Sequence, residues 1–402
     1  MKRKGIKIVS IILAVFVVLG LSGFLANTIT TSSLIKYAHS FDKVQYNEQL
    51  KPTYNESLDC YTFKTERDFK VLQLTDVHIG GGFMSTKKDK KAMNAVASMV
   101  SEEKPDLVIV TGDLVFPVPY QAGTFNNKNP HKVITNLMEQ LGVYYTVVFG
   151  NHDTEAYNYY DREAVGDFYD ELSEKSEYLL FSKGPNNIGG ACNHYINITN
   201  NQNVITQTLY MIDSNAYLDD DPLGLKWHYD NVHQDQIDWY KDKVRMMHEA
   251  NKIALNNDNA PMPKSLIFQH IPIKEVKVAF DEAWDDDTKS FKNTENVTYN
   301  FGKVGESAPY VFPPEDSLNY FDTILELGSS QGMFFGHDHL NNFSLTYKGF
   351  TFTYGLSIDY LAYGADRGCT VITVKNDGSF TIKQESYYQD KYKVKEEIEK
   401  ED

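Results

Sequence analysis

Short apolar runs alternate with amphipathic stretches over the first part of the chain, and this pattern indicates the fold. Apolar, β-branched runs predict buried strands at 69–76 (FKVLQLTD), 106–113 (DLVIVTGD) and 144–153 (YYTVVFGNHD). Helical periodicity predicts helices between them, at 87–103 and 130–141. Strands that alternate with helices pair in parallel through right-handed crossovers. We therefore predict an α/β fold whose ligands bind beyond the carboxyl ends of the strands.

The second part of the chain carries further strand patterns. Strands are predicted at 208–214 (TLYMIDS), 265–270 (SLIFQH) and 332–339 (GMFFGHDH), with a helix from His233 to about Asn251. We expect the last strands to form a mostly antiparallel sheet that closes the fold. These strands are predicted within 343–355 (FSLTYKGFTFTYG), 369–375 (CTVITVK) and 379–386 (SFTIKQES).

The N-terminus carries an uncharged, apolar stretch of 19 residues from Ile8 to Ala26. Its length approaches that of a membrane-spanning helix, so we expect residues 1–26 to anchor the chain. Four basic residues precede the stretch and predict that it keeps its N-terminal side in the cytoplasm and sends the rest outward: Lys2, Arg3, Lys4 and Lys7. A cleaved signal peptide, which would yield a secreted protein, is the alternative, but no clear A-x-A cleavage site follows the stretch.

Composition shifts predict the domain boundaries. Residues 27–66 are polar and weakly patterned, as in a juxtamembrane linker. The patterned region 67–390 is predicted to be one catalytic domain, and 391–402 a charged tail that is either a solvated helix or disordered.

Polar residues gather where the predicted strands end. Taken singly, each of these blocks has a structural explanation, such as a helix cap or a turn. Taken together they predict one site, because the carboxyl ends of parallel strands meet at the same edge of a sheet. The blocks are D-x-H at Asp76–His78, G-D at Gly112–Asp113, G-N-H-D at Gly150–Asp153, a single His270, and G-H-D-H at Gly336–His339.

These blocks supply more metal donors than one ion can use. Two ions about 3.5–4 Å apart can share them if one carboxylate bridges the pair, and Asp113 is central enough to be that bridge. Nitrogen and oxygen donors without thiolate predict two divalent transition-metal ions, Fe, Mn or Zn. The three cysteines, Cys60, Cys192 and Cys369, are too widely spaced for a metal knuckle or a disulfide framework. The seven donor residues are Asp76, His78, Asp113, Asn151, His270, His337 and His339.

All five blocks, in this order, resemble the pattern of the calcineurin-like metallophosphoesterase superfamily. The resemblance covers about Phe69 to Val374 and is strongest to the purple acid phosphatase-like branch. It implies a four-layer α-β-β-α sandwich of two mixed sheets. It also implies that His152 contacts the phosphate and protonates the leaving oxygen. The implied ligands are Asp76, His78, Asp113 and His339 for one metal, and Asp113, Asn151, His270 and His337 for the other.

The chain departs from true purple enzymes at two positions. His78 stands where those enzymes have Gly, and Phe116 stands where they have a metal-ligating Tyr. Phenylalanine cannot ligate, so we expect no tyrosinate-to-iron colour. Phe116 cannot orient His152 either, which leaves that role open; Asp153 is one candidate, and support of a ligand is the alternative role for it.

The predicted activity is hydrolysis of phosphoesters by a metal-activated hydroxide at a dinuclear site outside the cytoplasmic membrane, on a small-molecule or nucleotide-type substrate. The chain has 39 basic and 55 acidic residues, a net charge of −16, which disfavours nucleic acid as a partner. A nuclease or phosphodiesterase on the same scaffold and a non-enzymatic metal-binding surface protein remain as alternatives. The membrane is the other expected partner, through the N-terminal segment.

Overall fold

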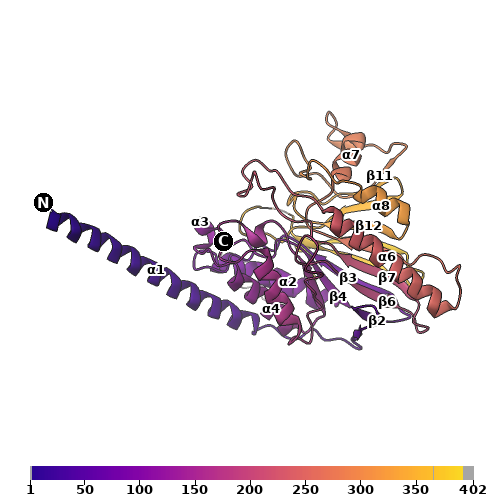
Figure 1. Cartoon of the computed structure of the whole chain (residues 1–402), viewed down its shortest axis with the longest axis horizontal. Coiled ribbons are helices and arrows are strands. Elements are labelled where there is room, and N and C mark those ends of the chain that lie inside the picture. The colour runs from indigo at the N-terminus through magenta and orange to yellow at the C-terminus, as the bar shows by residue number, and fades with distance from the viewer. Residues whose placement is uncertain (1, 365, 393–402) are drawn as a thin grey trace.

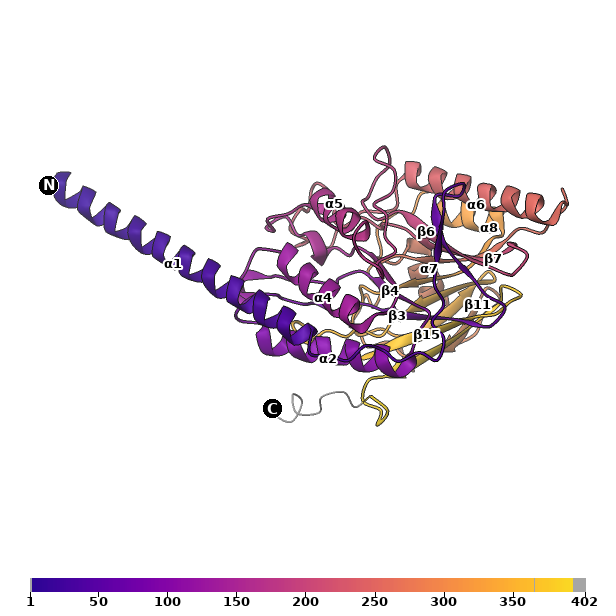
Figure 2. The same ribbon diagram turned by 90° about the horizontal axis from the view of Figure 1, so that it is seen from below.

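Two β-sheets packed face to face organise the chain, and helices cover their outer faces (Figures 1 and 2). The structure is a computed structural model that describes residues 2–364 and 366–392. Among the described residues, one sheet has five strands in the order β16-β15-β3-β4-β5, and the other has nine in the order β1-β2-β6-β7-β8-β12-β14-β13-β11.

The five-stranded sheet contains the first predicted strands. β3 (Phe69–Leu74), β4 (Leu107–Thr111) and β5 (Tyr145–Val148) pair in parallel, as predicted. The crossovers contain α2 (Thr86–Glu103) and α4 (Lys128–Leu141), which the helical periodicity also predicted. Every residue of β4 and β5 is buried, because a parallel sheet with covered faces exposes neither side of its strands.

The nine-stranded sheet is mixed. β7 pairs in parallel with β8, and β12 lies parallel to both β8 and β14, whereas β6 and β13 run antiparallel to their neighbours β7 and β14. Its strands are β1 (Thr53–Asn55), β2 (Cys60–Lys64), β6 (His194–Thr199), β7 (Ile205–Met211), β8 (Lys264–Phe268), β11 (Val297–Phe301), β12 (Ser330–Phe335), β13 (Ser344–Tyr347) and β14 (Phe350–Tyr354).

Two apolar cores define the layers. The larger core fills the space between the sheets and extends under α2 and α4. The smaller core lies between the nine-stranded sheet and the helices α6 (Gln234–Leu255), α7 (Lys274–Ala283) and α8 (Tyr320–Leu327). The predicted four-layer α-β-β-α sandwich of two mixed sheets is confirmed. The remaining elements are α3 (Pro119–Ala122), η1 (His152–Thr154), α5 (Arg162–Ser173), β9 (Trp284–Asp285) and β10 (Ser290–Phe291).

The prediction that the last strands form one closing sheet is wrong. β13 and β14 extend the nine-stranded sheet, whereas β15 (Gly368–Val374) and β16 (Phe380–Ser386) extend the five-stranded sheet, where β15 pairs antiparallel with β3. Alternation of apolar and polar residues reports which face of a strand is buried, but it carries no information on which strand lies alongside.

The prediction that residues 27–66 form a linker is wrong as well. Helix α1 (Lys2–Ala38) continues through the predicted boundary, and Leu34 and Ala38 on its last turns are fully buried in the core shared with α2 and α4. Further on, β2 adds to the nine-stranded sheet by parallel pairing with β6. A few apolar residues at helical spacing within a polar stretch suffice for this packing, and composition alone does not reveal them.

The two ends of the chain differ in how far the structure describes them. Within the described residues, one helical segment is long and apolar enough to cross a membrane, Ile12–Ala38, whose most apolar 18-residue window has a mean hydropathy of 2.2. At the other end, Tyr392 is buried and Lys391 donates to Glu103 Oε1 at 2.7 Å, so the predicted tail begins packed against α2. The rest of that tail, 393–402, lies outside the described residues.

Candidate metal centre

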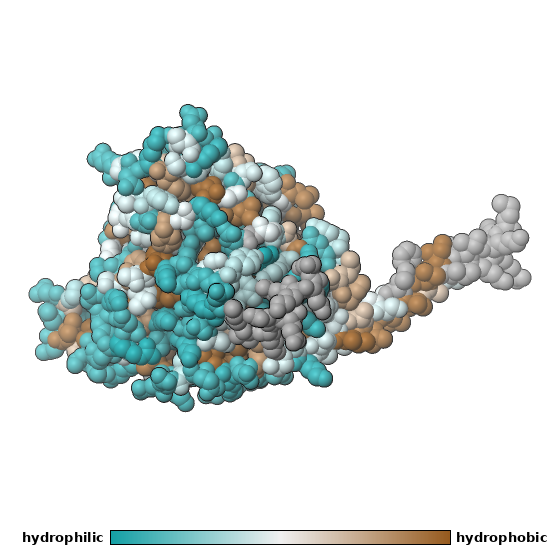
Figure 3. Space-filling model, turned by 180° about the vertical axis from the view of Figure 1, so that it is seen from behind, coloured by the Kyte–Doolittle hydropathy of each residue, from teal (hydrophilic) through white to brown (hydrophobic). Residues whose placement is uncertain are grey.

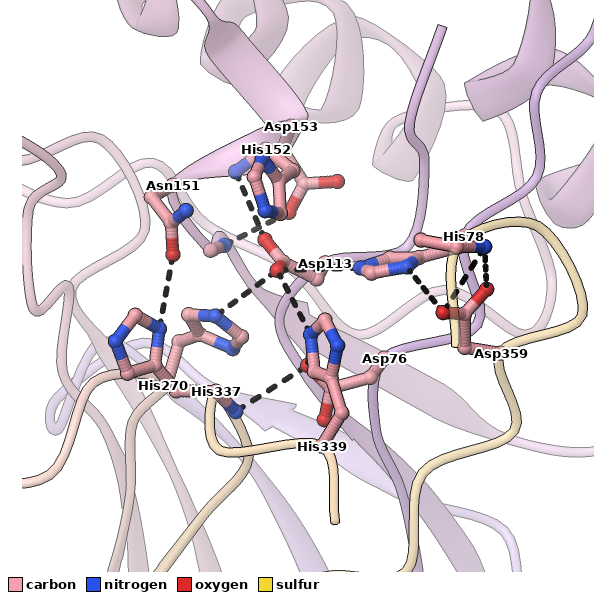
Figure 4. Close-up of polar contacts among 12 residues, drawn as sticks. Asp76, His78, Asp113, Asn151, His152, Asp153, His270, His337, His339 and Asp359 are labelled. Carbon is pink, nitrogen blue, oxygen red and sulfur yellow. Dashed lines mark hydrogen bonds and ion pairs between the residues drawn. The ribbon is translucent and has the colours of Figure 1, made fainter. Parts of the chain in front are cut away.

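The loops that follow five strands from both sheets converge on one site (Figure 4). From the five-stranded sheet come the loops after β3, β4 and β5; from the nine-stranded sheet come those after β8 and β12. Backbone hydrogen bonds hold the loops against one another: Asp76 N donates to Gly112 O, His78 N to Asp113 O, and Gly336 N to His270 O, each at 3.1 Å. The structure brings together all seven predicted metal donors.

Four of these donors form a compact group. Asp76, His78, Asp113 and His339 are buried, and one potential ligand atom from each lies within 4.8 Å of the others. His339 Nε2 is 3.2 Å from Asp76 Oδ1, and His78 Nε2 is 3.3 Å from Asp113 Oδ2. This is the set that the resemblance implies for the first metal.

The second implied set lies on the other side of Asp113. His270 Nε2 is 3.2 Å from Asp113 Oδ2, and His337 Nδ1 is 3.1 Å from Asn151 Oδ1. The His270 and His337 rings are 5.3 Å apart. One carboxylate oxygen, Asp113 Oδ2, therefore faces an imidazole from each set, which is the arrangement that a bridging ligand requires.

The site has a charge pattern suited to cations. Burial disfavours ionisation of Asp113, but the neighbouring His270 and His152 outweigh it and hold the pKa of that carboxyl well below its ordinary value. Burial and the adjacent His270 lower the pKa of His337 well below that of free histidine, so His337 is a neutral imidazole with an available lone pair. Burial disfavours a proton on the other three imidazoles, but the carboxylates that face His78, His270 and His339 outweigh it and raise their pKa, so a metal ion would replace a proton at each of them.

The donor atoms fit a metal. His270 donates from Nδ1 to Thr111 O at 2.9 Å, which fixes the tautomer and leaves Nε2 as the lone-pair nitrogen. Within the described part of the chain, that buried Nε2 makes no hydrogen bond, and it faces the Asp113 carboxylate. Either a proton or a metal ion has to lie between this nitrogen and the Asp113 oxygen, so the pair can serve as two ligands of one ion.

The backbone at the ligands is strained. Among the ligand residues, Asp76, His78, Asp113 and His337 have φ values of +51°, +53°, +49° and +75°. Such conformations cost of order 1–3 kcal/mol each and persist where the surrounding fold holds them. They aim the four side chains into the site, and nothing in the sequence pattern reports them.

Two motif glycines make room for ligands. A Cβ at Gly150 would lie 2.1 Å from Asp113 Oδ1, and one at Gly112 would lie 2.4 Å from His270 Nδ1. Gly112 also has φ +85°, which other residues rarely adopt. The glycines of the G-D and G-N-H-D blocks are thus required by the close approach of the metal donors.

His152 has a partner that the sequence did not reveal. Its Nδ1 donates to Glu155 Oε1 at 2.5 Å, and the same oxygen accepts from the hydroxyl of Tyr217 at 3.3 Å. Tyr217 in turn accepts from Asn151 Nδ2 at 2.7 Å. Glu155 is 6% exposed, so its carboxylate is shielded from water.

Asp153 does not orient His152, contrary to one of the two roles considered for it. Its Oδ1 accepts from Val115 N at 3.0 Å and its Oδ2 from Gly150 N at 2.7 Å, which ties the loops after β4 and β5 together. Adjacent residues in the 3₁₀ turn η1 point apart, and Figure 4 shows the two side chains diverging. Asp153 therefore supports the ligand loops.

A second carboxylate also escaped the sequence analysis. Asp359, in the loop after β14, lies with Oδ2 3.3 Å from His78 Nδ1 and orients that ring toward Asp113 (Figure 4). Burial disfavours the Asp359 anion, but the facing His78 lowers the pKa of Asp359 below its ordinary value. No motif marks this residue, and 281 positions separate it from His78 in the sequence, so no local signal could have paired them.

The Phe116 ring lies against both histidines, 4.2 Å from the His152 ring and 5.2 Å from the His78 ring. Position 116 thus offers the site an apolar surface and no ligand oxygen, as the sequence predicted. The Tyr229 ring also contacts His337, at 4.4 Å, and the Tyr363 ring contacts His339, at 4.5 Å. Aromatic side chains therefore border the site on several sides.

Two packed mixed sheets with a carboxylate shared between two sets of imidazoles at the strand ends define a metallophosphoesterase. The chain belongs to the calcineurin-like phosphoesterase family, whose model matches residues 69–341. All seven implied donors lie within the matched residues.

Two similar proteins come from one plant. "Probable inactive purple acid phosphatase 29" of Arabidopsis thaliana is 26% identical over 322 residues, 75% of each chain. "Probable inactive purple acid phosphatase 14" of the same plant is 24% identical over 331 residues, 75% of this chain and 73% of its own. A solved dimetal phosphatase from Danio rerio aligns with 80% of this chain and 97% of its own, with a TM-score of 0.46 and 10% identity.

Proposed function

We propose that the chain hydrolyses phosphoesters at a dinuclear metal centre outside the cytoplasmic membrane. Two divalent transition-metal ions would be held by the two sets described above, with Asp113 common to both. The observation that carries the proposal is the position of Asp113 Oδ2, 3.3 Å from His78 Nε2 and 3.2 Å from His270 Nε2.

Bound ions would lower the pKa of a water molecule and stabilise negative charge on the phosphoryl oxygens. The protein supplies the proton for the leaving group. Because Nδ1 of His152 donates to Glu155, Nε2 is the nitrogen that can release a proton to the leaving oxygen. Glu155 acts through His152 and is a positioning residue.

The N-terminal helix supports the proposed location. The basic residues before the apolar stretch favour a cytoplasmic N-terminus, so the domain after α1 would lie outside. The substrate is a small-molecule or nucleotide-type ester, and either a monoester or a diester fits the donor set.

Metal analysis combined with hydrolysis assays tests the proposal. The purified full chain, loaded with Mn²⁺, Fe²⁺ or Zn²⁺, should bind about two ions and hydrolyse p-nitrophenyl phosphate or its bis ester, whereas Asp113→Ala should lose both properties. His152→Ala should keep the metal and slow turnover about 10²- to 10⁴-fold.

The word "inactive" in the names of the plant relatives supports one other candidate, a metal-binding protein without hydrolytic activity. Two bound ions without turnover of either ester would favour that candidate. A chain that binds no metal would contradict both.

A further inference from the structure

Exposed aromatic and apolar side chains gather around helix α1 where it meets the body. They lie in the segments after β3, β4 and β5, with Tyr120 on α3, and are between 44% and 72% exposed. Exposed apolar groups collected in one place indicate a binding surface. We call this group the collar: Phe83, Met84, Tyr120, Phe125 and Tyr159.

Direct contacts join the collar to α1. Asn27 on α1 donates to Gly123 O at 3.0 Å and accepts from Phe83 N at 3.1 Å. The ring of Phe125 stacks on that of Tyr159 at 6.2 Å. Figure 1 shows α3, which lies between these loops, beside α1 at the end of the body from which the helix projects.

The helix sets the level of the collar relative to a bilayer. A 19-residue span from Ile8 to Ala26 is about 28 Å long at 1.5 Å per residue, close to the thickness of a hydrocarbon core. A groove of about 240 Å³ separates α1 from the body, and its walls include Gly20, Gly23 and Phe24 on the helix and Phe125 and Tyr159 of the collar. The collar therefore lies level with the last two turns of the span.

The side chains suit that level. Aromatic rings concentrate at the boundary between lipid and water, and surface-bound apolar groups enter it by about 5–10 Å. Figure 3 shows the apolar surface of α1 continuing to the point where the helix meets the body.

The collar lies close to the metal centre along the chain. Phe83 follows the ligand His78 by five residues, which span at most about 18 Å. The loops after β3 and β4 run side by side, bridged at Ile79 and Val115 immediately beyond the ligands. The same two loops thus carry metal donors at one end and collar residues at the other.

From these contacts we infer that the collar is seated in the bilayer surface and that the metal centre acts on a phosphoester carried by a membrane lipid. This inference rests on the proposed hydrolysis and names its substrate class. In the reaction, water adds its oxygen to phosphorus and loses one proton to solvent, and the bond from phosphorus to the lipid oxygen breaks. That oxygen takes a proton from His152, which then regains a proton from solvent.

Fluorescence tests the seating without any need for activity. The three native cysteines are buried, so Phe125→Cys or Tyr159→Cys can carry a single NBD label in the full chain, reconstituted in phosphatidylcholine vesicles. Ile253→Cys on α6, at an 81% exposed position, is the control. Brominated phosphatidylcholine should quench the collar labels several-fold more than the control. Equal quenching at all three positions overturns the seating.

Turnover tests the substrate class. The rate on a lipid ester in phosphatidylcholine vesicles is divided by the rate on the matching soluble ester: phosphatidate with p-nitrophenyl phosphate, or phosphatidylglycerol with the bis ester. The double variant Phe125→Ser, Tyr159→Ser should lower this ratio at least about tenfold, whereas Ile253→Ser should not. An enzyme that turns over only the soluble ester, or an unchanged ratio, overturns the lipid substrate. A chain that hydrolyses neither ester contradicts the proposed function instead.

Discussion

Glu155 accepts a hydrogen bond from Nδ1 of His152 at 2.5 Å. The two residues are three positions apart, and the 3₁₀ turn η1 that begins at His152 brings their side chains together. The carboxylate fixes the ring orientation and the tautomer of His152, which are the two properties that a general acid needs.

Replacing Glu155 should therefore affect poor leaving groups most. We expect Glu155→Ala to lower kcat on an alkyl phosphate about 10- to 100-fold and to lower it much less on p-nitrophenyl phosphate, whose leaving group needs little protonation. KM should change little. Glu155→Gln, whose amide oxygen can still accept from Nδ1, should restore part of the rate. Equal losses on both substrates would indicate a purely structural role; Glu249→Gln on the exposed face of α6 is the control.

Asp359 should control metal affinity through His78. We expect Asp359→Asn to weaken metal binding about 10- to 100-fold, because a carboxylate behind a ligating imidazole holds the ring and raises its basicity. Isothermal titration with Mn²⁺ or Zn²⁺ measures this change. Asp366→Asn, at an exposed aspartate that pairs with Lys303, should bind metal like the unchanged chain. Equal affinity of the two variants would refute the role of Asp359.

The buried His194 should make stability fall in acid. Burial lowers its pKa to about 4; its Nδ1 donates to Cys192 O and its Nε2 accepts from the Thr146 hydroxyl. In the unfolded chain the pKa returns to about 6.5, so the unfolded state binds a proton first as pH falls. Its contribution to stability is present above pH 6.5 and is lost progressively toward pH 4, by about 2 kcal/mol between pH 7 and pH 5.

Urea unfolding at pH 7 and pH 5 checks this prediction. His194→Gln should lose less stability between the two pH values than the unchanged chain does, by about the same 2 kcal/mol. His39→Gln, at an exposed position, should match the unchanged chain. The same pH dependence in all three proteins would contradict the assignment.

The second half of α1 should stabilise the catalytic domain. Leu34 is fully buried, so Leu34→Ala should lower the free energy of unfolding by about 2–5 kcal/mol. Lys36→Ala, on the exposed side of the same turn, should change it by less than about 0.5 kcal/mol. Thermal unfolding of the two variants in detergent measures the difference, and equal melting temperatures would mean that the segment is a linker after all.

The sequence by itself determined the three parallel strands of the five-stranded sheet and the polar residues that meet at their ends. Asp76, Asp113 and Asn151 directly follow apolar runs that alternate with helices, and parallel crossovers bring the carboxyl ends of such strands to one edge. The polar side chains of the site thus directly follow local strand patterns, and they occur in motif blocks whose order can be read from the sequence. The apolar N-terminal stretch is another local feature that length and composition reveal.

Only the tertiary structure decided which side chains support those donors. Asp359 meets His78 across 281 positions, the turn at η1 turns Glu155 rather than Asp153 toward His152, and β15 pairs with β3 rather than with β14. The tertiary structure also decided that residues 27–38 pack against α2 and α4. Periodicity reports whether a residue is buried, whereas its neighbours depend on how distant segments pack, and that information is not local to any stretch of the chain.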